Sequence, residues 1–129
     1  MKLQALPLFL LLEAAATIAW WGMLAAVPSS RQWFFPRSWP GFAVYSCLVS
    51  DLLFMVGAGI LGAVGIWRRA RWTRVVLWLH VGGVLYGTLL AISAWLLMGQ
   101  AVLGALLMSA DLVMLCLLMA VHFRRDRLP

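Results

Sequence analysis

Residues 75–97 read VVLWLHVGGVLYGTLLAISAWLL, a stretch without a single Asp, Glu, Lys or Arg. A transmembrane helix needs about 20 consecutive apolar residues to cross a hydrocarbon core about 30 Å thick. Because this stretch exceeds that length, it predicts a helix that spans a membrane. The titratable His80 then lies inside the span, where a polar side chain is energetically costly.

Three other stretches have the same character, and they occupy residues 5–27, 41–67 and 101–121. In the whole chain of 129 residues, 65% are hydrophobic and 11% are charged. Soluble proteins are about half apolar and about a quarter charged, so this composition excludes a water-soluble enzyme. The four stretches predict an all-α fold, an integral membrane four-helix bundle that forms a single transmembrane domain over residues 1–129.

The segment between the first two spans, residues 28–40, mixes prolines and arginines with four aromatic residues. Aromatic and basic side chains are typical of the layer where a membrane meets water. We therefore expect an amphipathic aromatic loop that lies flat on the membrane surface. The other connections are a basic turn over residues 68–74 and an uncharged turn over residues 98–100.

All ten basic residues lie outside the four apolar stretches, and their distribution predicts the orientation of the chain. Loops with an excess of Lys and Arg stay in the cytoplasm. The loop after the first span holds Arg31 and Arg37. The other eight lie on the side of both termini: Lys2, Arg68, Arg69, Arg71, Arg74, Arg124, Arg125 and Arg127. Both termini are therefore predicted to be cytoplasmic, and the strong asymmetry excludes a dual topology.

The N-terminal stretch also has the outline of a secretory signal peptide, because Lys2 precedes an apolar run that ends in small residues. Glu13 in the middle of this run and the bulky Trp20-Trp21 pair favour a retained helix instead. We therefore interpret this stretch as the first span.

The sequence indicates no cofactor, no metal site and no nucleic-acid partner. The net charge of +6 comes from the loops, whereas nucleic-acid binding needs a solvated basic surface. Cys47 and Cys116 lie in different spans without the spacing of metal ligands. A haem between His80 and His122 is disfavoured, because their depths differ by about a third of the hydrocarbon core.

Three of the four acidic residues lie inside the apolar stretches: Glu13, Asp51 and Asp111. A carboxylate near the bilayer centre costs at least about 2.5 to 3.5 kcal/mol, so such residues normally face the interior of a bundle. A rise of about 1.5 Å per residue places Glu13 and His80 at the same depth, about 10 Å from the cytoplasmic boundary. Asp111 falls near mid-membrane, close to the level of Tyr86, and Asp51 falls in the outer half.

Two interpretations of these residues are open. In the structural interpretation, Glu13 and His80 form one buried pair that sets the register of the helices. Asp111 then accepts a hydrogen bond from Tyr86 or Thr17. In the functional interpretation, the ionisable residues line a polar cavity that binds a ligand or passes protons. The candidate ligand-binding or proton-relay residues are Glu13, Asp51, His80, Tyr86 and Asp111.

His80 shares one face of its helix with four small residues, Gly83, Gly87, Ala91 and Ala94. Small side chains let membrane helices approach one another closely. We therefore expect this face of the third span to pack against a neighbouring span.

The layout resembles that of uncharacterised small four-span bacterial membrane proteins, the YvaD-like group. That group has an acidic residue before an aromatic pair in the first span, an Asp early in the second and a polar residue in the fourth. The corresponding residues here are Glu13 with Trp20-Trp21, Asp51 and Asp111. The resemblance implies a multi-pass protein of the bacterial inner membrane, and it implies no known activity.

The chain is also similar in layout to the EXPERA group of four-span sterol isomerases and sigma-2-type receptors. These proteins place acidic residues of the first two spans around a ligand cavity. Glu13 and Asp51 would take those positions, with His80 as a third polar wall. The longer first loop of that group, and its second acid one turn from a histidine, are not found here, which argues against isomerase activity. The alternative location is a eukaryotic endomembrane.

These observations favour a small membrane protein that binds a hydrophobic or cationic small molecule, such as a lipid-like ligand, in a polar cavity between its spans. Acid or base chemistry is an added role, and whether the chain is an enzyme stays open. The alternatives are a proton-coupled carrier that works as a homo-oligomer and a non-catalytic accessory subunit of a larger membrane complex. A cavity open to lipid favours the first function, a water path across the bundle the second, and a closed bundle the third.

The orientation can be tested by cysteine labelling in intact cells after removal of Cys47 and Cys116. We expect an impermeant maleimide to label Ser29→Cys and Gln100→Cys, because both sites face outward in the predicted topology. Thr73→Cys, on the cytoplasmic side, should be protected and serves as the control. Labelling of Thr73→Cys together with protection of Ser29→Cys and Gln100→Cys would show that the orientation is opposite to the predicted one.

Overall fold

The computed structural model describes residues 4–125, so Lys2 and Arg127 lie outside the described residues. Within this range all regular structure is helical. Four helices are long and apolar enough to cross a membrane, which confirms the four predicted spans. They are Ala5–Ala26, Gly41–Arg68, Thr73–Met98 and Val102–Arg124.

Residues that stop helix growth set the ends of two spans. α1 (Ala5–Ala26) ends shortly before Pro28, which lacks the N–H needed to continue a helix. α4 (Thr73–Met98) ends at Gly99, whose φ of 63° lies in the left-handed region that glycine adopts without strain. The chain therefore reverses direction within a few residues after α4.

The last span is longer than predicted. α5 (Val102–Arg125) continues four residues past the expected end at Val121. No glycine or proline stops it there, and the guanidinium of Arg74 lies 5.5 Å from the ring centroid of Phe123. The apolar stretch ends at Val121, whereas the helix continues into the polar residues that follow it.

The second span is not one uniform helix. α2 (Gly41–Asp51) and α3 (Ala58–Arg68) are joined by a π-helical segment at Leu52–Gly57. The N–H of Ala58 bonds to the carbonyl of Leu53, five residues back. Such segments are rare, and they are frequent at functional sites.

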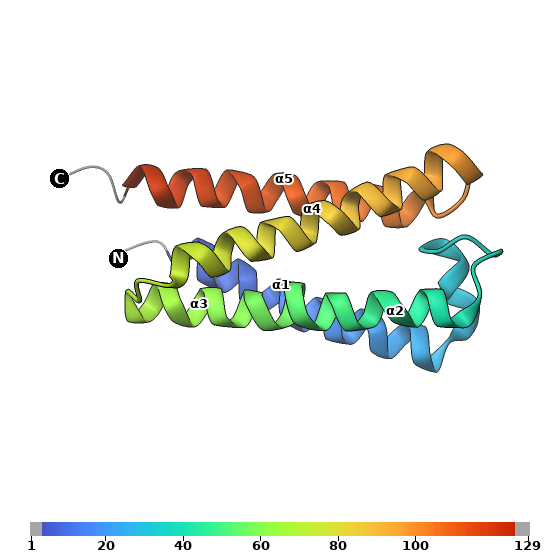
Figure 1. Ribbon diagram of the computed structural model, residues 1–129, viewed down its shortest axis with the longest axis horizontal. Coiled ribbons are helices and arrows are strands. Elements are labelled where there is room, and N and C mark those ends of the chain that lie inside the picture. The colour runs from blue at the N-terminus through green and yellow to red at the C-terminus, as the bar shows by residue number, and fades with distance from the viewer. Residues whose placement is uncertain (1–3, 126–129) are drawn as a thin grey trace.

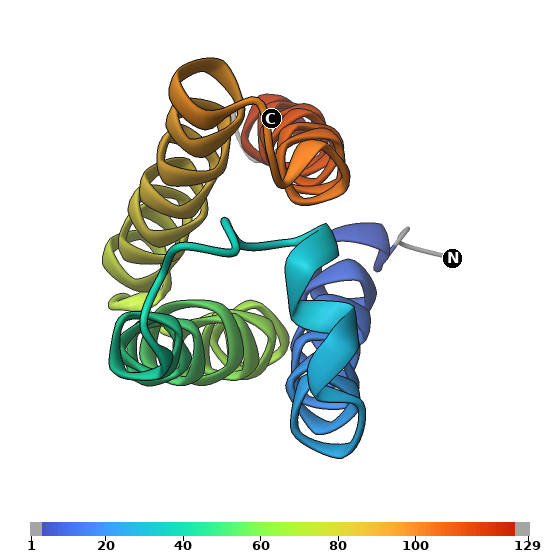
Figure 2. The ribbon, with the colours of Figure 1, turned by 90° about the vertical axis from the view of Figure 1, so that its right-hand side faces the viewer.

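The spans run side by side along one axis, with the loop of residues 28–40 and the α4–α5 turn at one end (Figure 1). The start of α1, the α3–α4 turn and the end of α5 lie at the opposite end. Viewed along the axis, the spans occupy four corners, with α4 packed against both α3 and α5 and α1 packed against α3 (Figure 2). Arg31 and Arg37 are thus separated from the basic α3–α4 turn by the length of the bundle, as the charge pattern requires.

The helices pack tightly near the α3–α4 turn. Leu10 of α1 and Leu77 of α4 are fully buried there. A Cβ on Gly62 of α3 would lie 3.0 Å from Leu77 and 3.3 Å from Leu10, so even a methyl group there would press against both side chains. This packing closes the bundle at that end.

The aromatic loop covers the other end of the bundle. It begins with a 3₁₀ helix at Pro28–Trp33, and the segment that follows crosses the end of the bundle (Figure 2). Phe35 is 8% exposed, and its ring centroid lies 5.9 Å from that of Trp20. The backbone N–H of Arg37 donates to Oε1 of Gln100 at 2.8 Å, which ties the loop to the α4–α5 turn. Part of the loop therefore faces the protein interior, a feature that the expectation of a flat surface loop did not include.

The contact between α4 and the π-helical segment depends on Gly83, because a Cβ there would clash with the Cβ of Phe54. We expect Gly83→Ala to lower stability by about 1–3 kcal/mol, the usual cost of overpacking. Gly82→Ala is the matched control, since a Cβ at this position meets nothing within 4 Å. Thermal unfolding in detergent measures both. Equal losses for the two variants would contradict the close approach at Gly83.

Candidate functional site

Glu13 and His80 form a buried pair between α1 and α4. Nε2 of His80 lies 2.9 Å from Oε2 of Glu13. His80 is fully buried and Glu13 is 8% exposed. The contact that their equal depth predicted is confirmed.

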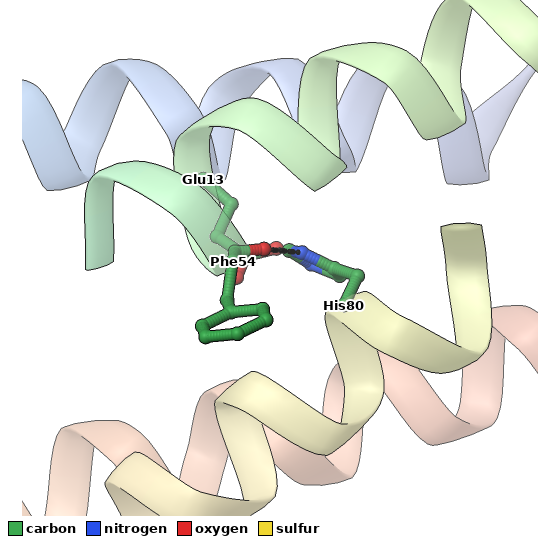
Figure 3. A network of polar contacts seen from close by, with 3 residues as sticks. All are labelled: Glu13, Phe54 and His80. Carbon is green, nitrogen blue, oxygen red and sulfur yellow. Dashed lines mark hydrogen bonds and ion pairs between the residues drawn. The ribbon is translucent and has the colours of Figure 1, made fainter. Parts of the chain in front are cut away.

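The imidazole of His80 makes a second contact on its opposite side. Nδ1 lies 2.6 Å from the backbone carbonyl oxygen of Phe54 (Figure 3). A carbonyl oxygen only accepts hydrogen bonds, so Nδ1 must carry a proton. The ring is thereby held between two spans, with one nitrogen assigned as a donor.

This assignment determines how many protons the pair holds. With Nδ1 protonated, a neutral ring presents an acceptor at Nε2, so the contact with Glu13 requires one further proton between the two atoms. The pair is then either imidazolium and carboxylate or imidazole and carboxylic acid. Both states have a net charge of zero, so the proton can move between the partners without placing net charge in the membrane.

The π-helical segment supplies the carbonyl that orients His80. In a regular α-helix, each backbone carbonyl accepts a hydrogen bond from the N–H of the residue four positions later. The ladder departs from that pattern over Leu52–Gly57, and the Phe54 carbonyl reaches across to α4. Gly83 on α4 leaves room for Phe54. A Cβ on Gly59 of α3 would lie 3.4 Å from the imidazole ring of His80, so α3 also approaches this ring closely. Nothing in the apolar pattern of this span marked the segment in advance.

Asp111 on α5 lies beside the pair. It is within hydrogen-bonding range of the Glu13 side chain and feels the charge of His80. Oδ2 of Asp111 and Oε1 of Glu13 are both buried, and when both carboxyl groups are ionised neither finds an N–H or O–H donor among the described residues. Two carboxyl oxygens without donors at one place inside a membrane are unusual, because buried polar atoms are nearly always bonded.

The expectation that Tyr86 or Thr17 donates a hydrogen bond to Asp111 is wrong. No such bond is formed within residues 4–125. The side chain of Tyr86 is 64% exposed on the outside of the bundle, although its depth matches that of Asp111. Depth alone therefore did not identify the partner, because the rotation of each helix also matters.

Asp51 lies nearer the aromatic loop and has its own donor. Nε1 of Trp21 on α1 donates to Oδ2 of Asp51 at 2.9 Å, a bond that joins the first two spans. The sequence interpretation did not include this role for Trp21. The signal was present, since an indole N–H inside a membrane needs an acceptor and Asp51 offers one at a similar height.

All three carboxyl groups line one cavity of about 640 Å³ between the four spans. No Lys or Arg of the described chain contributes to its lining. His80 is not in the lining and lies behind Glu13. Much of the remaining wall is aromatic: Trp20, Phe34, Phe35, Trp39 and Phe54.

Most of the small residues on the His80 face of α4 line this cavity, and fewer of them are sites of close helix packing. Gly83 packs against the second span as expected. Gly87, Ala91 and Ala94, however, line the cavity. Their short side chains leave space that larger residues would fill, so the expectation of a continuous packing face was correct for part of the stripe.

The cavity reaches the outside of the bundle between helices. Ser46 of α2 and Tyr86 of α4 line it and are also exposed, and so are Leu12 of α1 and Leu107 of α5. The end of the bundle is covered instead, because the loop lies over it (Figure 2). Access from the side is thus the more open route.

Comparison of the chain with models of known families, with characterised proteins and with solved structures finds no match. Among residues 4–125, no three or more His, Cys, Asp and Glu side chains lie close enough to hold a metal ion. The function therefore has to be inferred from the side chains of the cavity.

The Glu13–His80 contact predicts strong energetic coupling. Removing one member of a buried pair leaves the other unpaired at a cost of about 3–5 kcal/mol, whereas removing both costs much less. We expect Glu13→Gln and His80→Leu each to destabilise the detergent-solubilised protein, and the double variant to lose clearly less than their sum. Unfolding of the four proteins measures the coupling.

The matched control combines Glu13→Gln with Ser109→Ala. Ser109 bonds to the Ala105 carbonyl within its own helix, so these two losses should add. Additive losses for Glu13 and His80 as well would show that their contact contributes nothing to stability.

Proposed function

We propose that this protein binds an amphiphilic small molecule with a cationic head, such as a lipid-like amine, inside the membrane. The observation that carries the proposal is the pair of buried carboxyl oxygens without donors, on Glu13 and Asp111, at the wall of a cavity that has no basic residue. A ligand ammonium would supply the missing positive charge at these oxygens, with N–H donors in a protonated amine and by charge alone in a quaternary ammonium.

The shape and the apolar wall of the cavity support the same ligand class. Small-molecule sites commonly have volumes of about 300–1,000 Å³, so a cavity of about 640 Å³ is large enough for a drug-sized molecule. Trp20 and Trp39 line the cavity, and indole rings are the best partners for cation–π contacts with an ammonium group. The aliphatic remainder of the wall suits a hydrocarbon body.

The proposed setting is the bacterial inner membrane, with both termini in the cytoplasm. The separation of Arg31 and Arg37 from the basic α3–α4 turn supports this orientation. The layout similarity to the YvaD-like proteins supports the location, and the similarity to the EXPERA group supports a ligand held by Glu13 and Asp51. Contact between Glu13 and the ligand, with His80 behind it, also suits acid or base chemistry.

The proton-coupled carrier is the second candidate, favoured by the proton held between Glu13 and His80. The tight packing around Leu10 and Leu77 leaves the cavity closed toward the α3–α4 turn, which supports binding over passage. An accessory subunit would need no cavity of this size. Binding is therefore the function that we place first.

Ligand binding can be tested with dodecyltrimethylammonium in nanodiscs of zwitterionic lipid, with tryptophan fluorescence as the signal. Trp20 and Trp39 line the cavity, so we expect saturable quenching for the wild type. Ala91→Phe should weaken binding by about tenfold or more, because the ring fills space that the ligand needs. Ala110→Phe, at an exposed position outside the lining, is the control and should bind as the wild type. Equal binding by the two variants would place the ligand elsewhere.

A further inference from the structure

We propose that binding of a cation in this cavity releases one proton, and that this proton comes from the neighbouring carboxyl groups of Glu13 and Asp111. This inference rests on the proposed cation site. It concerns the charge state of the empty site and how that state changes when a ligand enters.

The first step is the contact between the two carboxyl groups. Oε1 of Glu13 and Oδ2 of Asp111 are buried without a donor, and the two side chains lie within hydrogen-bonding range of each other. Two carboxylates repel, so carboxyl groups lie side by side in a buried place when they share a proton. In the empty cavity Asp111 therefore carries the proton that Glu13 accepts.

The second step excludes His80 as the source. Its Nδ1–H is held by the Phe54 carbonyl at 2.6 Å, and one further proton occupies the contact with Glu13. Loss of that proton would set the lone pair of Nε2 against a carboxylate at 2.9 Å. The Glu13–His80 pair therefore keeps its proton, and the exchangeable one is shared with Asp111.

The third step is the net charge of the site. The Glu13–His80 pair and the protonated Asp111 together have a net charge of zero. A bound monovalent cation adds one positive charge in a medium where uncompensated charge is very costly. Release of the Asp111 proton restores neutrality and gives the cation a carboxylate partner.

Other titratable groups that face the cavity do not need to take part. Asp51 on the second span already accepts the N–H of Trp21. Tyr86 on α4 lies at the exposed rim, and Cys47 on α2 lies near Asp51. Asp51 therefore already has a hydrogen-bond donor, and Tyr86 and Cys47 lie away from the Glu13–Asp111 contact.

The experiment is calorimetric titration of the wild type in nanodiscs with dodecyltrimethylammonium, in two buffers of different ionisation enthalpy. This probe is permanently charged, so any proton released comes from the protein. We expect about one proton per bound cation at pH 7 and an affinity that rises about tenfold per pH unit, because linkage is reciprocal. Binding with no proton release would overturn the inference and leave the proposed function standing. Absence of binding would overturn both.

Two variants locate the source of the proton. Asp111→Asn should bind the probe at least about tenfold more weakly, because the cation loses its carboxylate partner. The binding that remains should release no proton and should not depend on pH, since the amide cannot ionise. Ser109→Ala is the control on the same helix, because Ser109 lies outside the lining and bonds to the Ala105 carbonyl; it should still release about one proton on binding. Release that survives in Asp111→Asn, or that disappears in Ser109→Ala, would contradict the assignment. If Asp111→Asn does not fold, the proton count and the pH slope of the wild type decide.

Discussion

A polar atom inside a hydrocarbon layer has no water to bond to, so it must find its partner within the protein. This constraint explains why Glu13, His80 and the Phe54 carbonyl come from three different spans. The bonds that satisfy these atoms also join α1, the second span and α4 at one depth. The bond from Trp21 to Asp51 repeats the arrangement closer to the aromatic loop. The exceptions among the described residues are the indole N–H of Trp20 and one carboxyl oxygen each of Glu13 and Asp111, and all three residues line the cavity.

Much of the fold could be predicted because apolar runs of this length have few alternatives in structure. The regular rise of a helix also placed Glu13 opposite His80 before either was seen in contact. The π-helical segment could not be predicted in this way, because its residues are as apolar as those of the neighbouring α-helix. It is explained by contacts with another span, where His80 binds the Phe54 carbonyl and Gly83 leaves room for the ring.

The candidate site was predictable in depth but not in rotation. Tyr86 was placed at the level of Asp111, yet its side chain lies at the exposed rim of the cavity and forms no hydrogen bond to Asp111, because the rotation of each helix depends on its neighbours. The face of α4 that carries Gly83, Gly87, Ala91 and Ala94 was also open to two interpretations. A short side chain can allow a neighbouring helix to pack closely, or it can leave space for a cavity. Ala91 lines the cavity, so its short side chain leaves space there. The inward packing of Phe35 likewise depends on aromatic partners that come from another segment.

The aromatic loop over one end of the bundle has a consequence for selectivity. Because a Cβ on Gly104 would lie 3.1 Å from the carbonyl oxygen of Phe34, the loop fits tightly against α5. A molecule that enters between the helices would place its head group and the adjoining part of its chain in the cavity and leave the rest of the chain among the lipids outside. The volume of the cavity then limits the width of the head group and not the number of carbons in the tail. Such a site would sort molecules by charge and by head-group cross-section, and it would treat a homologous series of chains alike.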